Sequence, residues 1–187
     1  MAHTLSRFIA AAMLLTFAAA ASAQDIWTAA GITGIVDEAD GGLHSFNSTG
    51  SVSIKSSVSR GTLDIRYPIH HLGPLGLSNC VELRARLRDT GPDARVVVRL
   101  LSLDITTGEL RSLGTIDSNR PEQTPPADLT DYSLYRTCLN VDSSLPFDFV
   151  FFTYYVDAQL TKSSGSGNPG LMALQICTDD RCEGAGR

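Results

Sequence analysis

The chain has 187 residues, of which 43% are hydrophobic, and its 15 basic and 20 acidic side chains give a net charge of −5. A chain of this length can bury one sizeable core, so we expect a single domain. The mild negative charge excludes a general attraction to nucleic acid or anionic membranes. Beyond the N-terminal segment, no apolar stretch is long enough to predict a membrane-spanning helix.

Residues 1–23 are typical of a secretory signal peptide. Arg7 supplies a positive charge, an apolar run follows at 8–20, and an Ala-Ser-Ala motif ends at Ala23. The run is too short to anchor the chain in a bilayer. We therefore expect cleavage near Ala23, a mature domain at 24–187, and a secreted or periplasmic protein.

The new N-terminus alternates apolar residues at Ile26, Ala30, Ile32 and Val36, which predicts an ordinary first strand. The same pattern also fits a strand that is donated to a neighbouring subunit.

An acidic turn follows, with carboxylates at Asp37, Glu38 and Asp40. Calcium accepts carboxylate and carbonyl oxygens in loose geometry, so these three residues are the candidate calcium ligands and calcium the one candidate cofactor. The segment is not an EF-hand loop, because Val36 and Asn47 would occupy required ligand positions. A plain acidic turn is the interpretation we favour.

Alternation of apolar and polar residues continues through most of the chain and predicts β-strands. In residues 81–88 the odd positions are apolar and the even positions are charged. Turn-forming residues at 89–93 and 106–109 predict hairpins between antiparallel strands. The other predicted strands are 51–58, 61–67, 95–103, 110–116, 132–139 and 170–177.

Residues 147–156 form the densest apolar segment, with aromatic side chains on both parities. This pattern predicts a central strand buried on both faces, with Phe149 and Phe152 pointing to opposite sides. The alternative is an open aromatic platform for a sugar ring.

Arginines gather on one predicted sheet face. Arg84, Arg86 and Arg88 project from the same side of one strand, and across the predicted hairpin Arg95 and Arg99 would lie beside them. Five guanidinium groups on one face would bind a carboxylate, sulfate or phosphate. The interpretation we favour is a solvated strand face that is partly neutralised by neighbouring acids, with an anion-binding surface as the alternative.

All four cysteines lie after the predicted cleavage site, and an even number in an exported protein predicts disulfides. Of the three ways to pair them, we favour a local Cys177–Cys182 bond and a long-range Cys80–Cys138 bond.

Together these features predict an all-β fold, a two-sheet antiparallel β-sandwich of jelly-roll or immunoglobulin-like topology that is stapled by disulfides. The sequence contains no recognisable catalytic or cofactor-binding motif. We therefore predict a non-catalytic binding module for a glycan or a small anionic ligand. One alternative is a structural subunit of a cell-surface or extracellular complex that assembles by strand addition, and another is a secreted hydrolase without a known motif. The expected partner is an extracellular ligand or protein, with no nucleic acid and no membrane insertion.

Overall fold

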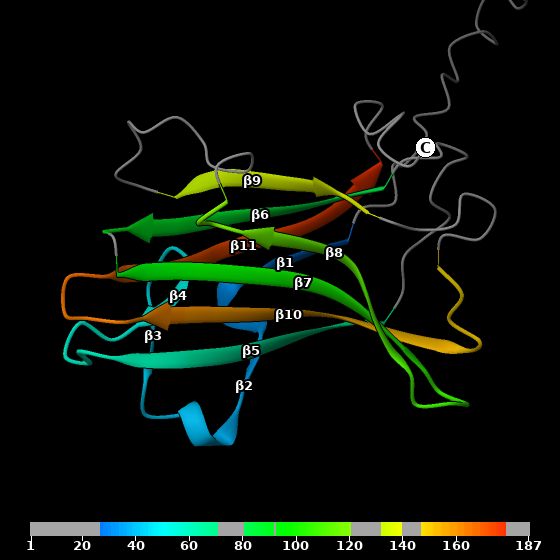
Figure 1. The fold of residues 1–187 in the computed structure, drawn as a ribbon, viewed down its shortest axis with the longest axis horizontal. Helices are drawn as coiled ribbons and strands as arrows, with labels where there is room; N and C mark the ends of the chain where they lie inside the picture. Colours follow the sequence, from blue (N-terminus) through cyan, green and yellow to red (C-terminus); the bar gives the residue numbers. More distant parts are fainter. Residues whose placement is uncertain (1–26, 71–80, 92, 121–131, 140–146, 179–187) are drawn as a thin grey trace, which may run out of the picture.

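The computed structural model describes residues 27–70, 81–91, 93–120, 132–139 and 147–178. In these residues two antiparallel sheets pack face to face, as the sequence predicted (Figure 1). The predicted signal segment lies outside the described residues. None of the helices in the described ranges is long and apolar enough to cross a membrane.

The first sheet has the strand order β3-β4-β11-β6-β9, and β1 pairs with the same edge of β11 as β4. Its strands are β1 (Trp27–Ala30), β3 (His44–Phe46), β4 (Val52–Ile54), β6 (Val81–Thr90), β9 (Ser133–Cys138) and β11 (Asn168–Thr178).

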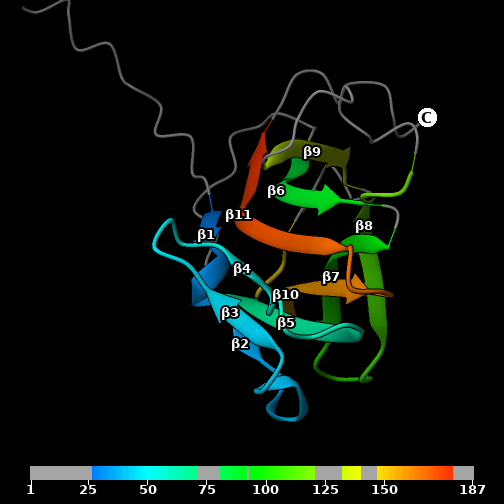
Figure 2. The same ribbon diagram turned by 90° about the vertical axis from the view of Figure 1, so that its left-hand side faces the viewer.

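The second sheet has the order β2-β5-β10-β7-β8, with β10 at its centre. Figure 2 shows the two sheets as separate layers. The strands of the second sheet are β2 (Ile35–Val36), β5 (Gly61–Ile69), β7 (Ala94–Asp104), β8 (Leu110–Asp117) and β10 (Phe152–Lys162). Two 3-10 turns, η1 (Gly31–Thr33) and η2 (Glu38–Asp40), follow β1 and β2.

The core lies between the sheets and is built from the inward residues of each strand. On β6 these are Leu83, Ala85 and Leu87, which are all 0% exposed. On β10 they include Val156 and Leu160, which are also 0% exposed. Because side chains alternate along a strand, burying these residues sends the charged positions of β6 to the outer face.

The predicted hairpin at 89–93 is wrong, because β6 and β7 belong to different sheets. The short connection between these strands carries the chain from one layer of the sandwich to the other. By contrast, the turn at 106–109 does join paired strands, β7 and β8.

The predicted first strand is divided between the two sheets. β1 pairs with β11 of its own chain and β2 pairs with β5, with Gly31 at the crossing between them. A Cβ on Gly31 would lie 2.1 Å from the carbonyl oxygen of Leu171, so only glycine fits there. The hydroxyl of Tyr67 donates a hydrogen bond of 2.7 Å to the Gly31 carbonyl and holds the crossing against the core.

The prediction of one buried strand over 147–156 is wrong in its first half, because β10 begins only at Phe152. The carboxylate of Asp148 accepts hydrogen bonds from the backbone N–H groups of Val150 and Phe151, which folds this segment into a turn. Phe149 is 37% exposed and Phe151 54% exposed, so neither is a core residue.

Two of the four cysteines lie in the described residues. Cys138 takes part in a disulfide bond, and Cys177 on β11 is buried. Each predicted pair includes a cysteine outside the described residues, Cys80 or Cys182, so both pairings stay predictions.

A core residue of β10 and an exposed residue of the turn before it make a direct stability comparison. Leu160→Ala should lower the free energy of unfolding by about 2–5 kcal/mol, because it opens a cavity in the core. Phe151→Ala should lower it by about 0.5 kcal/mol or less, because the ring is largely in solvent. Urea unfolding of both variants checks this, and a severe loss for Phe151→Ala would mean that the turn is packed into the core.

Candidate functional site

The outer face of the first sheet carries the arginines of β6. Strand register places these arginines beside outward residues of the neighbouring strands and so creates two rows across the sheet. The first row runs through Ala30, Ala173, Arg86 and Leu134. The second row runs through Thr28, Gln175, Arg84 and Arg136.

These two rows surround a groove with a volume of about 370 Å³. The short side chains of Ala30 and Ala173 leave the space, and the longer side chains of Arg86 and Leu134 border it. A β-bulge in β11 between Leu171 and Ala173 adjusts the register at this point. The groove is lined by Thr28, Ala29, Ala30, Arg84, Arg86, Leu134, Ala173, Leu174 and Gln175.

A buried carboxylate organises the positive charge at one end of the groove. Glu82 is 2% exposed and accepts a hydrogen bond from Nε of Arg84 through its Oε2 atom. Its Oε1 atom lies 4.0 Å from Nε of Arg136. Glu82 therefore holds Arg84 in place, because a buried carboxylate is stable only when it is paired.

Arg86 is the guanidinium that this network leaves available. It is exposed, and it makes no hydrogen bond or ion pair with any residue that the structure describes. Arg88 is occupied differently: its Nη2 donates to Oδ1 of Asn168 at 2.9 Å, and its guanidinium stacks 4.9 Å from the ring centroid of Tyr132.

The structure separates the five predicted arginines. Arg95 and Arg99 lie on β7, on the outer face of the opposite sheet, because the chain changes sheet between β6 and β7. Only Arg84, Arg86 and Arg88 share a face, so the prediction of one five-arginine surface is wrong.

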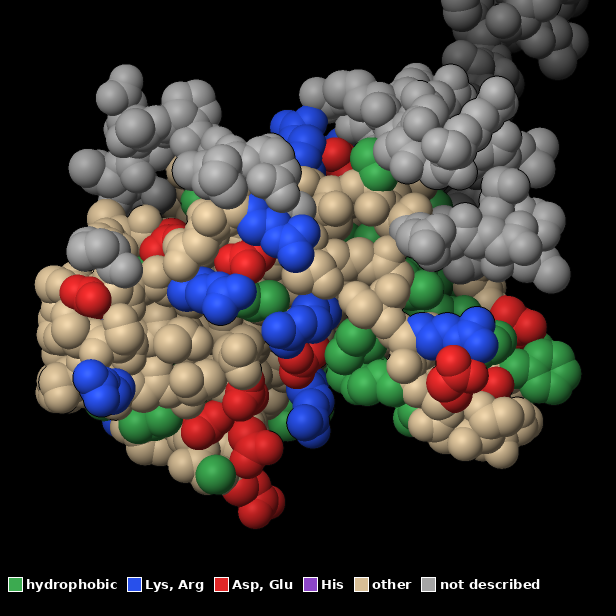
Figure 3. All heavy atoms as spheres, in the orientation of Figure 1, with side chains coloured by type: hydrophobic (Ala, Val, Ile, Leu, Met, Phe, Trp, Pro, Cys, Tyr) green, Lys and Arg blue, Asp and Glu red, His purple; other side chains and the backbone are tan. Residues whose placement is uncertain are grey.

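On the second sheet the arginines are paired with acids. Arg95 forms a bidentate ion pair with Asp117, with its Nη2 atom 2.6 Å from Oδ2. This bond lowers the pKa of Asp117 below its usual value. Figure 3 shows basic and acidic side chains side by side across this face.

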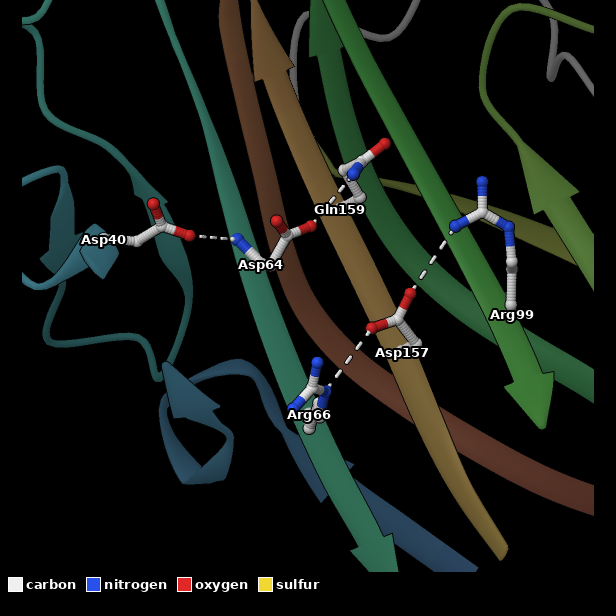
Figure 4. A network of polar contacts seen from close by, with 6 residues as sticks. All are labelled: Asp40, Asp64, Arg66, Arg99, Asp157 and Gln159. Atoms are coloured by element: carbon white, nitrogen blue, oxygen red, sulfur yellow. Dashed lines mark hydrogen bonds and ion pairs between the residues drawn. The ribbon is translucent and has the colours of Figure 1, made fainter. Parts of the chain in front are cut away.

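A polar network covers the middle of the second sheet (Figure 4). Asp157 on the central strand lies 3.5 Å from Arg99 and 4.0 Å from Arg66. Nε2 of Gln159 donates to Oδ1 of Asp64 at 2.9 Å. Burial raises the pKa of Asp157, Arg99 and Arg66 oppose that shift, and Asp64 adds to it.

The three candidate calcium ligands do not form a cluster. The carboxylate of Asp37 accepts a hydrogen bond from the N–H of Ala39 in its own turn. The carboxylate of Asp40 accepts from the backbone N–H of Asp64. Among the described residues, no three His, Cys, Asp or Glu side chains converge to hold a metal ion. Glu38 therefore has no second and third described ligand residue beside it.

The sequence carries no signal that marks Thr28, Leu134 or Gln175 as residues that line the groove. Each is an outward residue on a different strand, and no local motif marks any of them. Only the register of the paired strands brings them next to Arg84 and Arg86.

No family model matches the chain, and no curated protein matches it. Among solved structures it is similar to a family two carbohydrate esterase from Cellvibrio japonicus, at 11% identity and a TM-score of 0.39, over 82% of this chain and 34% of that one. The chain therefore spans about a third of the esterase.

Two further structures are similar over most of their length. One is the family 30 carbohydrate-binding module of a cellulosomal cellulase of Clostridium thermocellum, at 12% identity and a TM-score of 0.46, over 84% of this chain and 93% of that one. The other is the K1 cleaved adhesin domain of Lys-gingipain from Porphyromonas gingivalis, at 14% identity and a TM-score of 0.42, over 82% and 98%. All three TM-scores are below 0.5. The candidate site is therefore argued from the geometry of this chain alone.

Removal of the buried charge tests the role of Glu82. Glu82→Gln should lower the free energy of unfolding by about 1.5–3 kcal/mol, because Arg84 loses its charged acceptor. Glu109→Gln is the matched control: Glu109 forms an ion pair with Arg111 in which both side chains are more than half exposed, and its loss should leave the denaturation midpoint unchanged. Equal midpoints for both variants would show that Glu82 does not organise the groove.

The two paired acids of the second sheet should respond to pH with opposite sign. The raised pKa of Asp157 means that its ionisation disfavours the folded state, so Asp157→Asn should match wild type near about pH 3 and be more stable above about pH 6. The lowered pKa of Asp117 means that its ionisation favours folding, so Asp117→Asn should be less stable at neutral pH, with the difference vanishing in acid. Thermal melts across this pH range check both signs, and differences of the same sign at neutral pH would contradict this account.

Proposed function

We propose that this chain is a binding module that holds a glycan in the groove on the outer face of the first sheet. The observation that carries the proposal is the free guanidinium of Arg86 at the border of a groove of about 370 Å³. A volume of this order suits a small-molecule ligand or a segment of a longer one.

The lining of the groove matches the two kinds of surface that a sugar presents. Thr28, Gln175 and Arg86 offer a hydroxyl, an amide and a guanidinium for hydrogen bonds to ring hydroxyls. Leu134 and Ala173 offer aliphatic surface to the C–H face of a ring. Binding sites generally combine a largely apolar lining with a few placed polar groups of this kind.

The site is built on paired strands rather than on loops. Its lining residues come from β1, β11, β6 and β9, whose hydrogen-bonded register fixes their spacing. A ligand can bind to a rigid face of this kind without the loss of conformational entropy that accompanies the ordering of a loop.

We also propose that the protein is exported after cleavage near Ala23. The support is the signal-like segment at 1–23 together with the disulfide-bonded state of Cys138, since disulfides persist in oxidising compartments. The Cys80–Cys138 and Cys177–Cys182 pairings belong to the same proposal.

The test is affinity gel electrophoresis of the mature chain against a panel of neutral and acidic soluble polysaccharides. We expect retardation by at least one polymer, and we expect Arg86→Gln to weaken that binding by about tenfold or more, since hydrogen bonds to charged groups are among the stronger ones. The variant should melt like wild type, because Arg86 has no partner among the described residues.

Arg66→Gln is the matched control, since Arg66 is exposed on the opposite sheet. It should bind like wild type. If Arg86→Gln is retarded as strongly as wild type, the groove is not the binding site. If no polymer of the panel retards the wild-type protein, the proposed function is overturned.

A further inference from the structure

The two outer faces of the sandwich differ in charge balance. On the second sheet, Arg95 is paired with Asp117, and Arg66 and Arg99 both lie near Asp157. On the first sheet the outward residues of the strands include four arginines, Arg84, Arg86, Arg88 and Arg136.

Only one carboxylate opposes these four arginines among the outward strand residues that the structure describes on this face. It is Glu82, which is buried and already engaged by Arg84. Among its described strand residues, the face around the groove therefore carries more positive than negative side chains, although the whole chain has a net charge of −5. Uncompensated positive charge that is concentrated in a concave site favours a ligand of opposite sign.

We infer that the ligand of this groove is an acidic glycan, whose carboxylate or sulfate groups are bound by Arg86 with support from Arg84; this inference rests on the proposed function. Arg84 and Arg86 are two residues apart on one strand, so their side chains leave the sheet about 7 Å apart on the same side. The planar fork of a guanidinium binds the two oxygens of such an anion in parallel.

The apolar part of the lining favours a ligand larger than a small inorganic anion. Leu134, Ala173 and Ala30 border the same space as Arg86, and a bare phosphate or sulfate would leave this surface without contacts. A sugar ring that carries an acidic group supplies both the charge for the arginines and the C–H surface for the aliphatic residues.

Glu82 gives the two arginines different roles. Glu82 forms an ion pair with Arg84, which fixes the direction of the Arg84 guanidinium and partly neutralises its charge. Arg86 retains its full charge and is free to bind the anion. Loss of Arg86 should therefore remove the preference for acidic glycans, whereas Arg86→Lys should keep the preference and weaken binding, because an ammonium group is a point charge without the fork.

The experiment compares acidic polymers with their neutral counterparts in affinity gels. Polygalacturonate is compared with its carboxyl-reduced form, and dextran sulfate with dextran. We expect wild type to be retarded by an acidic member at least about tenfold more strongly than by its neutral counterpart, and we expect sodium chloride to weaken this binding steeply. The pair that shows the difference identifies carboxylate or sulfate as the group recognised.

Arg86→Gln should lose both the preference and the salt dependence, while Arg66→Gln should keep both. Equal retardation by acidic and neutral members would overturn this inference and leave the proposed function standing. An acidic preference that persists in Arg86→Gln would also overturn it. No retardation by any of these four polymers would overturn this inference, whereas the proposed function is overturned only if no polymer of the wider panel is bound.

Discussion

The packing of the two sheets through their inward side chains determines on which outer face each residue of the proposed site lies. The inward residues of β6 and β10 are removed from water almost completely, and each buried leucine contributes about 1.5–3 kcal/mol to that packing. A strand cannot turn one residue inward without turning the next one outward. The arginines of β6 therefore face solvent as a consequence of where Leu83 and Leu87 are buried.

The charge on the two outer faces is arranged differently although both faces are rich in arginine. On the second sheet, Arg95 and Arg99 form ion pairs with acids on adjacent strands, so their charges are compensated (Figure 4). The first sheet contains one buried carboxylate, and it orients Arg84 without compensating Arg86. Of the two faces, only that of the first sheet has an arginine, Arg86, that makes no ion pair with a described residue and can therefore contact a ligand.

A second exposed surface lies at the opposite end from the β6–β7 connection, where the β7–β8 turn meets the turn before β10. Hydrophobic side chains gather there (Figure 3). Ile105, Leu110, Val150 and Phe151 are each more than half exposed. The turns that carry them are held by hydrogen bonds, including one of 2.9 Å from the N–H of Ile105 to the carbonyl of Phe151. The exposed aromatic character of this segment is thus a property of two ordered turns and not of a strand face.

The sequence by itself determined the all-β class, most strand positions and the outward direction of Arg84, Arg86 and Arg88, because alternation at period two depends only on neighbouring residues. It did not determine which sheet each strand joins: a short connection such as 89–93 can close a hairpin or cross between layers, and core packing decides between them. That choice separated Arg95 and Arg99 from the other arginines. Only the tertiary structure placed Thr28, Leu134 and Gln175 beside Arg86, because contacts between strands far apart in the chain depend on their register, and no local pattern records it.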